Sequence, residues 1–378
     1  MLPDLRNRTL VDSFGQIYGR GTIATLDVPL QISLLNSIHP YHTLLNGFPA
    51  VIGLTEPVSV SRDHGVYHRI KTTDAPVALK ARRLSAEKLK ASKLEFSRLC
   101  KLGHGRPSKS PWATPIHLVP KGNSFRIVGD YRKLNACTVP DRYPVRRLMD
   151  FTTILHGTKV YSTLDLKRAF YQIPLHPDDI EKTAVITPFG LYEYTVMTFG
   201  LRNAAQTFQR FADAALGDLS FVFVYIDDIL IASPNLEIHK KHLQIVLERL
   251  QKFGLQLNLE KCAFGQPEVD FLGFRINEIG FKPLEDKVKA IVEYPRPKTV
   301  EELRRFLSMI NFYRECIPRV AHSQLYLNKY LSKAKKKDKS PIAWDPDALQ
   351  AFEDCYKEIN RGDVTCFPKR KSADTLGN

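Results

Sequence analysis

The residues best suited to chemistry in this chain are two adjacent aspartates, Asp227 and Asp228, which lie inside an apolar stretch. Like charges a few ångströms apart repel each other, and partial burial between apolar neighbours raises that cost. A divalent cation resolves the conflict, because hard metal ions bind several carboxylate oxygens at once. The alternative is a solvated hairpin turn, in which Asp is a common residue, and the pair taken alone favours this alternative.

A third carboxylate, Asp165, lies at the end of a predicted strand, residues 160–166, where the chain enters a predicted helix at residues 167–172. If that strand and the strand that leads to Asp227 pair in one sheet, Asp165 and Asp227 can meet at its edge. Three carboxylates that hold two Mg²⁺ ions, with Mn²⁺ as a substitute, suit phosphoryl transfer to a hydroxyl. One ion lowers the pKa of an attacking 3′-hydroxyl, and the other stabilises a leaving pyrophosphate.

Helices and hairpin strands must position these carboxylates. Helical spacing of apolar residues covers 86–102, 204–216, 238–253, 283–317 and 347–359. Strand patterns cover 116–120, 125–128, 269–274 and a short run near 281, and residues 221–232 predict a strand–turn–strand unit with the two aspartates at its turn. This alternation predicts an α+β centre followed by mainly helical material.

Short motifs occur in a characteristic order along the chain. Residues 225–230 read YIDDIL, and residues 162–174 read STLDLKRAFYQIP. The others are SPWA at 110–113, DYRKLN at 130–135, FGLRNA at 199–204, TFQ at 207–209 and FLGF at 271–274. Over about residues 64–358, their order and spacing resemble the reverse transcriptases of Gypsy-type long-terminal-repeat retrotransposon Pol polyproteins. Thr198 departs from the pattern, because that family usually has Pro before the Phe-Gly pair.

The resemblance implies roles for individual residues. Asp165, Asp227 and Asp228 match the catalytic, metal-binding aspartates, and the backbone carbonyl of Leu166 is implied as a further metal ligand. Arg126 matches the arginine of the fingers that contacts the incoming triphosphate.

Further residues are implied to line the nucleotide site. Lys121 is expected as a second triphosphate contact. Phe170 matches the bulky residue that excludes a 2′-hydroxyl, and Phe199 and Gly200 match residues that pack beside the nucleotide. Alternatives stay open at this stage: Arg126 and Lys121 as solvated hairpin charges, and Phe170 as a core aromatic.

The implied fold class is α+β, a right-hand polymerase with fingers, a palm built on a ferredoxin-like sheet, a thumb and a partial connection segment. We expect residues 1–62 to be a weakly structured protease tail and linker, 63–279 the fingers and palm, 280–332 the thumb, and 333–378 a partial connection and divergent tail. Residues 5–12 resemble the tail of the element's aspartic protease, but Phe14 follows Asp12-Ser13, so the protease's catalytic motif is absent. No ribonuclease H site can be assembled from residues 360–378.

Composition is consistent with a nucleic-acid partner. Lys and Arg (55) exceed Asp and Glu (40), which gives a net charge of +15 and suits a polyanion through counterion release. A basic soluble protein without that role is the alternative. The six cysteines are scattered without a Cys-x-x-Cys pair, which favours reduced thiols in an intracellular setting. His239 and His242 are interpreted as solvated helix residues, not metal ligands.

No signal peptide is readable, and the apolar run at 221–232 is too short to span a bilayer, so we expect no membrane partner. The localisation we expect is cytoplasmic, in a virus-like particle, or nuclear. The expected function is an RNA-directed DNA polymerase that uses an RNA or DNA template–primer and dNTPs, and the oligomeric state stays open. The alternative is a retrotransposon relic that binds nucleic acid without catalysis. An RNA-directed RNA polymerase is disfavoured by Phe170 and by the motif order.

Overall fold

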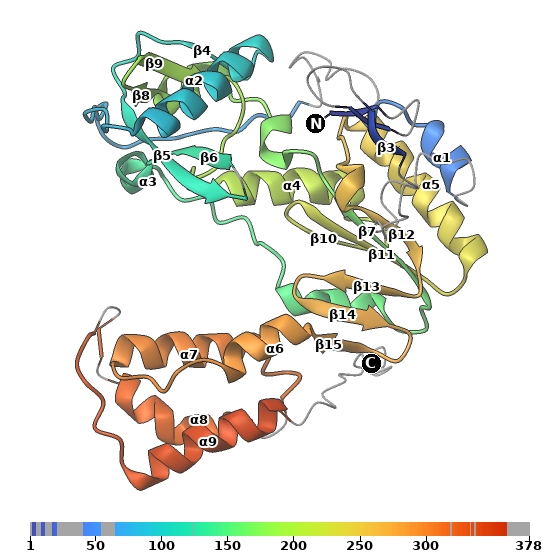
Figure 1. Ribbon diagram of the computed structural model, residues 1–378, viewed down its shortest axis with the longest axis vertical. Coiled ribbons are helices and arrows are strands. Elements are labelled where there is room, and N and C mark those ends of the chain that lie inside the picture. Colours follow the sequence, from blue (N-terminus) through green and yellow to red (C-terminus); the bar gives the residue numbers. More distant parts are fainter. Residues whose placement is uncertain are drawn as a thin grey trace, which may run out of the picture.

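The computed structural model describes residues 2–4, 9–11, 17–20, 41–53, 65–122, 124–317, 320–332, 334–335 and 338–360. Within them, a central antiparallel sheet lies between a mixed helix-and-sheet part, at the top of Figure 1, and a helical part in orange and red at the bottom. These parts are arranged as the expected fingers, palm and thumb.

The palm sheet consists of β7 (Val160–Asp165), β10 (Val222–Tyr225), β11 (Asp228–Ser233) and β12 (Ala263–Gln266). Its strand order is β10-β11-β7-β12, and every neighbouring pair is antiparallel. Helix α4 (Ala204–Leu216) precedes β10, and α5 (Leu236–Lys252) connects β11 to β12. With the fingers elements inserted between β7 and α4, the β-α-β-β-α-β order is the expected ferredoxin-like sheet.

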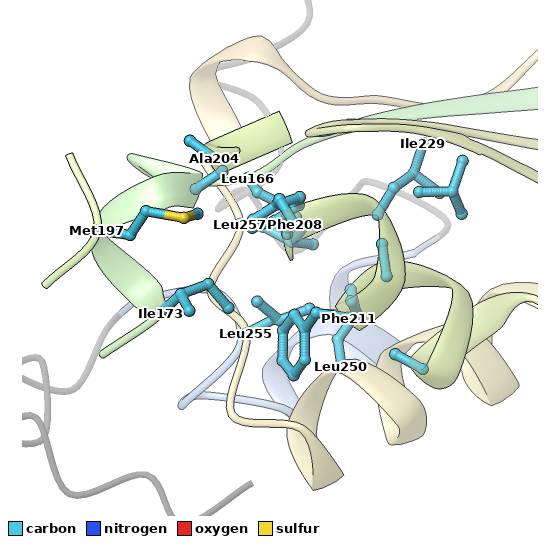
Figure 2. Packing of buried hydrophobic residues seen from close by; sticks show 14 of the residues in the cluster. Leu166, Ile173, Met197, Ala204, Phe208, Phe211, Ile229, Leu250, Leu255 and Leu257 are labelled. Atoms are coloured by element: carbon cyan, nitrogen blue, oxygen red, sulfur yellow. The ribbon is translucent and has the colours of Figure 1, made fainter. Parts of the chain in front are cut away.

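Both faces of the palm sheet are covered, which explains why its strands are apolar almost throughout. On one face, Leu164 and Ile229 join a core cluster with residues of α4 and α5. Figure 2 shows part of this cluster around Phe208. On the opposite face, Tyr161 and Leu230 belong to a second cluster, shared with the elements that lead to the thumb.

The fingers hold α2 (Ala86–Lys101), α3 (Arg132–Cys137) and a sheet of order β4-β9-β8-β5-β6. The strands of that sheet are β4 (Gly105–Pro107), β5 (Thr114–Lys121), β6 (Ser124–Gly129), β8 (Val185–Thr187) and β9 (Gly190–Tyr194). The helix predicted at 86–102 is confirmed as α2, and the predicted hairpin is confirmed as β5–β6. At 167–172, however, the chain forms only the 3₁₀ turn η3 (Ala169–Gln172), because Arg168 adopts a left-handed conformation with φ 50°. A second 3₁₀ helix, η4 (Pro177–Thr183), follows.

A small sheet joins palm to thumb: β13 (Glu268–Phe271), β14 (Phe274–Asn277) and β15 (Phe281–Pro283). The prediction of one strand over 269–274 is wrong, because the chain reverses at Leu272 and Gly273. Both have positive φ, 48° and 88°, as a tight hairpin turn requires. The 3₁₀ helix η2 (Leu148–Ile154) packs its buried Phe151 into the same core.

The thumb contains α6 (Glu285–Val292), α7 (Val300–Phe312), α8 (Val320–Asn328), η6 (Lys329–Leu331) and α9 (Pro346–Asn360). Residues 333–378, which include α9, are expected to form a partial connection and divergent tail. Helix α9 packs against α6 and α8, and its Ala351 and Phe352 share one buried cluster with Phe306 of α7. In packing terms α9 therefore belongs to the thumb.

The N-terminal region has more structure than we expected. Strands β1 (Leu2–Asp4), β2 (Thr9–Val11) and β3 (Ile17–Arg20) form a three-stranded sheet. Residues 41–53 contain α1 (His42–Asn46), and their Tyr41, Leu45, Val51 and Ile52 side chains are buried in the palm core, so the expectation of weak structure is wrong for this segment. Part of the protease-like stretch at 5–12 and the tail at 361–378 lie outside the described residues.

No helix among the described residues has both the length and the apolar character needed to cross a membrane.

Candidate active site

A strained turn presents Asp227 at the tip of the β10–β11 hairpin. Tyr225 pairs with Asp228, so Ile226 and Asp227 form a two-residue connection. Ile226 has φ 56°, a left-handed conformation that is unfavourable for a β-branched residue. Such strain persists only where neighbours over-determine the backbone.

Gln209 of α4 is the neighbour that holds this turn. Its Oε1 accepts a hydrogen bond from the Ile226 N–H at 2.9 Å, and its Nε2 donates to the Val224 carbonyl at 3.2 Å. The side chain is fully buried. The TFQ motif at 207–209 includes Gln209, but the sequence alone indicates no separate role for it. A glutamine beside Phe208 on the buried face of an amphipathic helix was the available signal, since a buried amide needs partners.

Register brings Asp165 and Asp228 together. They are directly opposite each other where β7 and β11 pair, and side chains of directly paired residues project from the same face of a sheet. Alternation along β7 and β11 puts both on the face of Tyr161 and Leu230, where β13–β15 and the thumb elements lie. The predicted sheet is present, but the strand register sets Asp228, and not the predicted Asp227, opposite Asp165.

Two neighbours of Asp165 were not predicted. Asn258 donates from Nδ2 to Oδ1 at 3.3 Å and from its backbone N–H to the Asp165 carbonyl at 2.8 Å. Lys261, at the end of η5 (Leu259–Lys261), lies with Nζ 3.3 Å from Oδ2. Both are more than 90 positions away in sequence, so no local pattern points to them.

The carboxylates are electrostatically coupled. Burial, followed by the charges of Asp227 and Asp165, raises the pKa of Asp228 to about 6. Burial and the charge of Asp165 also raise the pKa of Asp227, while Lys261 and Arg126 lower it. Half-buried acids that repel one another are characteristic of sites that bind a cation.

The donor set fits divalent metal ions in its chemistry. Asp227 and Asp228 supply hard oxygen ligands from adjacent positions, and the Lys261 ammonium already places a positive charge against Asp165. Within the described ranges, however, no group of three or more His, Cys, Asp or Glu side chains is arranged to hold a metal. Mg²⁺ commonly completes its shell with waters and substrate phosphates, so a partial protein cage is consistent with it.

The Leu166 carbonyl faces the hairpin. The Asp165 carbonyl accepts a bond from Asn258, and the Lys167 N–H donates to the Gln256 carbonyl. Backbone groups of successive residues in an extended chain point to opposite sides. Since those of Asp165 and Lys167 point toward residues 256–258, the Leu166 N–H and carbonyl point the other way, toward β11. This is the direction that the predicted role as a metal ligand needs.

Three of the expected nucleotide residues, Arg126, Phe170 and Phe199, gather in one cluster. The Phe170 and Phe199 ring centroids are 5.1 Å apart, and the Arg126 guanidinium lies 5.2 Å from the Phe199 ring. The Arg126 charge also partly offsets the raised pKa of Asp227, so it acts on that carboxyl. Phe170 is only half-buried and lies 5.9 Å from the Phe208 ring, so it lines the core without being enclosed by it.

Gly200 ties this cluster to the fingers. Its φ is 90°, and a Cβ there would lie 3.4 Å from the Gly129 carbonyl, so only glycine suits the position. Its carbonyl accepts a bond from Asn135 Nδ2 at 2.7 Å. Lys121 ends β5, and its side chain is outside the described part of the structure.

His239 is not the solvated residue that we expected. It is fully buried, with Nε2 2.6 Å from Ser162 Oγ and Nδ1 2.8 Å from Ser233 Oγ. Burial lowers its pKa to about 4. The interpretation was wrong because α5 turns this face onto the palm sheet.

Residues 119–276 match the family described as reverse transcriptase (RNA-dependent DNA polymerase). The chain is 36% identical over 357 residues to the retrovirus-related Pol polyprotein from transposon opus of Drosophila melanogaster, a match that covers 89% of this chain and 35% of that protein. It is 39% identical to the Pol polyprotein from transposon 297 of the same organism, over 70% of this chain and 25% of that protein. The transposon Tf2-3 polyprotein of Schizosaccharomyces pombe is 35% identical, over 70% of this chain and 20% of that protein. The chain therefore spans about a third or less of these relatives.

Solved structures with the same fold include the foamy viral protease–reverse transcriptase. Its complex with double-stranded DNA aligns with a TM-score of 0.75 and 24% identity, covering 90% of this chain and 73% of that chain. Its complex with an RNA/DNA hybrid aligns with a TM-score of 0.74 and 23% identity, covering 92% of this chain and 48% of that chain. This likeness confirms the predicted right-hand, α+β fold.

Proposed function

We propose that this chain is an RNA-directed DNA polymerase, which adds deoxynucleotides to a primer 3′-hydroxyl on an RNA or DNA template. The observation that carries the proposal is the pairing of Asp165 with Asp228 beside the strained turn that presents Asp227. The family match over residues 119–276 supports the same activity. The structural neighbours were solved with double-stranded DNA and with an RNA/DNA hybrid, which supports a template–primer duplex as the partner.

In the proposed reaction the primer 3′-hydroxyl gives up its proton to solvent, and its oxygen forms a bond to the α-phosphorus of a dNTP as the bond between that phosphorus and pyrophosphate breaks. Asp165, Asp227, Asp228 and the Leu166 carbonyl would hold two Mg²⁺ ions, or Mn²⁺. When bound, such ions lower the pKa of the 3′-hydroxyl and stabilise charge on the departing pyrophosphate. No protein side chain needs to change its covalent state.

The remaining residues position the reactants. Arg126 offsets negative charge on the triphosphate, where a guanidinium can bind two oxygens at once. The Phe170 and Phe199 rings form an apolar wall for the sugar. Asn258 fixes the orientation of Asp165 through its hydrogen bond to Oδ1, which keeps the metal ligands in place before substrate arrives.

The finer assignment to the Gypsy class of long-terminal-repeat retrotransposons is part of this proposal and rests on the motif order. Its setting would be intracellular, in a virus-like particle or the nucleus. The described cysteines, Cys100, Cys137, Cys262, Cys316 and Cys355, are free thiols, which is compatible with a reducing compartment.

Primer extension on poly(rA)–oligo(dT) with Mg²⁺ or Mn²⁺ tests the proposal. We expect extension by the unaltered chain and a loss of about a thousandfold or more in Asp227→Asn, equivalent to about 4 kcal/mol of transition-state stabilisation. Asp218→Asn is the matched control, since Asp218 is exposed and pairs with Arg249 away from the hairpin. Duplex binding without extension would instead favour the non-catalytic relic.

A further inference from the structure

Residues 41–53 are distant in sequence from the aspartates but join the same palm core. Figure 1 places α1 of this segment beside α5. The core cluster that contains Leu166 also contains four side chains of the segment: Tyr41, Leu45, Val51 and Ile52. The family match begins at residue 119, so it assigns this segment no role.

The backbone of the segment bonds to residues 256–258 from one side. The Leu257 N–H donates to the Val51 carbonyl at 2.7 Å, and Gln256 Nε2 donates to the Ala50 carbonyl at 3.2 Å. Gln256 and Leu257 are both buried, so these groups have no ready replacement in water if the segment leaves.

The end of β7 bonds to residues 256–258 from the other side. The Asn258 N–H donates to the Asp165 carbonyl at 2.8 Å, and the Lys167 N–H donates to the Gln256 carbonyl at 2.8 Å. Asn258 Nδ2 also donates to Asp165 Oδ1. Residues 256–258 thus form a middle layer. The Leu257 N–H and the Gln256 side chain bond outward to Val51 and Ala50, and the backbones of Gln256 and Asn258 bond inward to Lys167 and Asp165.

The start of the segment is also anchored. The Tyr41 ring lies against Gly265 of β12, where a Cβ would collide with it and where φ is +59°. The same ring meets His239 of α5 edge-on, with centroids 6.1 Å apart. Contacts at Tyr41 and at Val51 together hold the segment at both ends.

We infer that residues 41–53 form a strap that positions Asp165, by clamping residues 256–258 against the end of β7. The polymerase unit then begins at or before residue 41, not at 63. That Asp165 binds metal rests on the proposed function, whereas the clamping rests on the hydrogen bonds alone. Misplacing a catalytic group by about 1 Å can lower a rate by roughly a hundredfold, so a loosened strap would lower activity without removing any catalytic side chain.

The test compares two equal truncations in the full chain. Leu45→Ala loosens the strap, and Leu99→Ala is the matched control in α2 of the fingers; the two leucines are 2% and 1% exposed. Each variant is studied at a temperature at which denaturation curves show it to be folded. The readouts are hydrogen exchange of peptides covering residues 255–262, Mn²⁺ binding without nucleic acid or dNTP, and kcat and KM for dTTP.

We expect Leu45→Ala to speed exchange at 255–262 by about tenfold, to weaken Mn²⁺ binding several-fold and to lower kcat more than it changes KM. Leu99→Ala should change none of these beyond its effect on global stability. Equal effects of the two variants, or unchanged exchange and Mn²⁺ binding in Leu45→Ala, would overturn the inference that residues 41–53 position Asp165.

Gln256→Met keeps the test decisive if Leu45→Ala fails to fold. It removes the bond to the Ala50 carbonyl and preserves the backbone bonds of residue 256, so faster exchange and weaker Mn²⁺ binding support the strap. Wild-type values in both measurements would refute it. A chain that extends no primer would refute the proposed function instead, while exchange at 255–262 would still decide whether residues 41–53 clamp this segment.

Discussion

At the residue scale, the raised pKa of Asp228 connects the site to the stability of the fold. Its folded-state pKa of about 6 lies above the ordinary value of 3.8. Below pH 3.8 the carboxyl is protonated in both the folded and the unfolded chain, so it does not change the free energy of unfolding. As pH rises from about 4 to about 6, the unfolded chain ionises more readily, and the metal-free protein loses stability.

Metal binding should therefore stabilise the protein in a pH-dependent manner. We expect Mg²⁺ or Mn²⁺ to raise the melting temperature more at pH 8 than at pH 5. At the higher pH the carboxylates are ionised, so they bind the cation, and the cation reduces the repulsion between them. Asp228→Asn should raise the melting temperature of the metal-free protein at pH 8 and reduce the metal-induced increase. Thermal melts with and without metal measure this, with Asp218→Asn as control. Equal metal effects at the two pH values would contradict the prediction.

Phe170 offers a second prediction at this scale, concerning the sugar. Its ring packs on Phe199 but stays half-exposed, so it can contact a nucleotide. Phe170→Ala should reduce the preference for dTTP over UTP, as a ratio of kcat/KM on poly(rA)–oligo(dT), by roughly tenfold or more. Phe170→Tyr retains the ring and should retain the preference. Unchanged discrimination in the alanine variant would remove the assignment and leave Phe170 as a core aromatic.

At the element scale, the β10–β11 hairpin works only as part of a larger assembly. A two-residue turn with Ile226 at φ 56° is intrinsically unfavourable, and α4 compensates through Gln209. The helix therefore contributes to the site without contributing a ligand. The same principle applies to residues 256–258, which lie between the end of β7 and residues 50–51 and fix Asp165 from outside the sheet.

Gln209→Leu should disturb the turn while preserving side-chain volume. The Ile226 N–H and the Val224 carbonyl would lose their bonds to the amide, at about 1–3 kcal/mol for each group left unsatisfied. We expect a lower unfolding free energy and a kcat that falls more than KM for dNTP changes. Gln206→Leu, one turn earlier on α4, is the control, because Gln206 Oε1 has no hydrogen-bond partner to lose. Similar effects from both substitutions would argue against the turn-holding role.

At the scale of the whole molecule, fingers, palm and thumb form two buried clusters that divide along the palm sheet. One cluster joins α4 and α5 to the fingers, and the other continues through β13–β15 into the thumb helices. Thumb packing is therefore continuous with the sheet face that carries Asp165 and Asp228. A net charge of +15 would add a salt-dependent attraction for a duplex passing this face.

Phe352 in α9 tests whether the last helix is needed by the thumb. Its ring lies 4.8 Å from Phe306 and 5.4 Å from Trp344, and Phe352→Ala should cost about 3–5 kcal/mol of local stability. We expect weaker template–primer binding, measured by fluorescence anisotropy, with little change in KM for dNTP at saturating duplex. Glu353→Ala, at the exposed neighbouring position, should bind the duplex normally. Normal duplex binding by Phe352→Ala would place α9 outside the working thumb.

The sequence by itself determined the order of the main elements and the aspartates worth examining. The helices at 86–101 and 204–216, the β5–β6 hairpin and the turn at Asp227 follow from periodicity and turn chemistry, which are properties of neighbouring residues. The resemblance to reverse transcriptases supplied the candidate roles, and the structure gathers Arg126, Phe170 and Phe199 in one cluster.

Only the tertiary structure decided how the site is held. The register that sets Asp165 opposite Asp228, the contacts of Asn258 and Lys261 with Asp165, and the strap at 41–53 all join positions far apart in sequence. Burial of His239 and the packing of α9 were misjudged for the same reason. A local pattern records which face of an element is apolar, but which partner covers that face depends on how the whole chain packs.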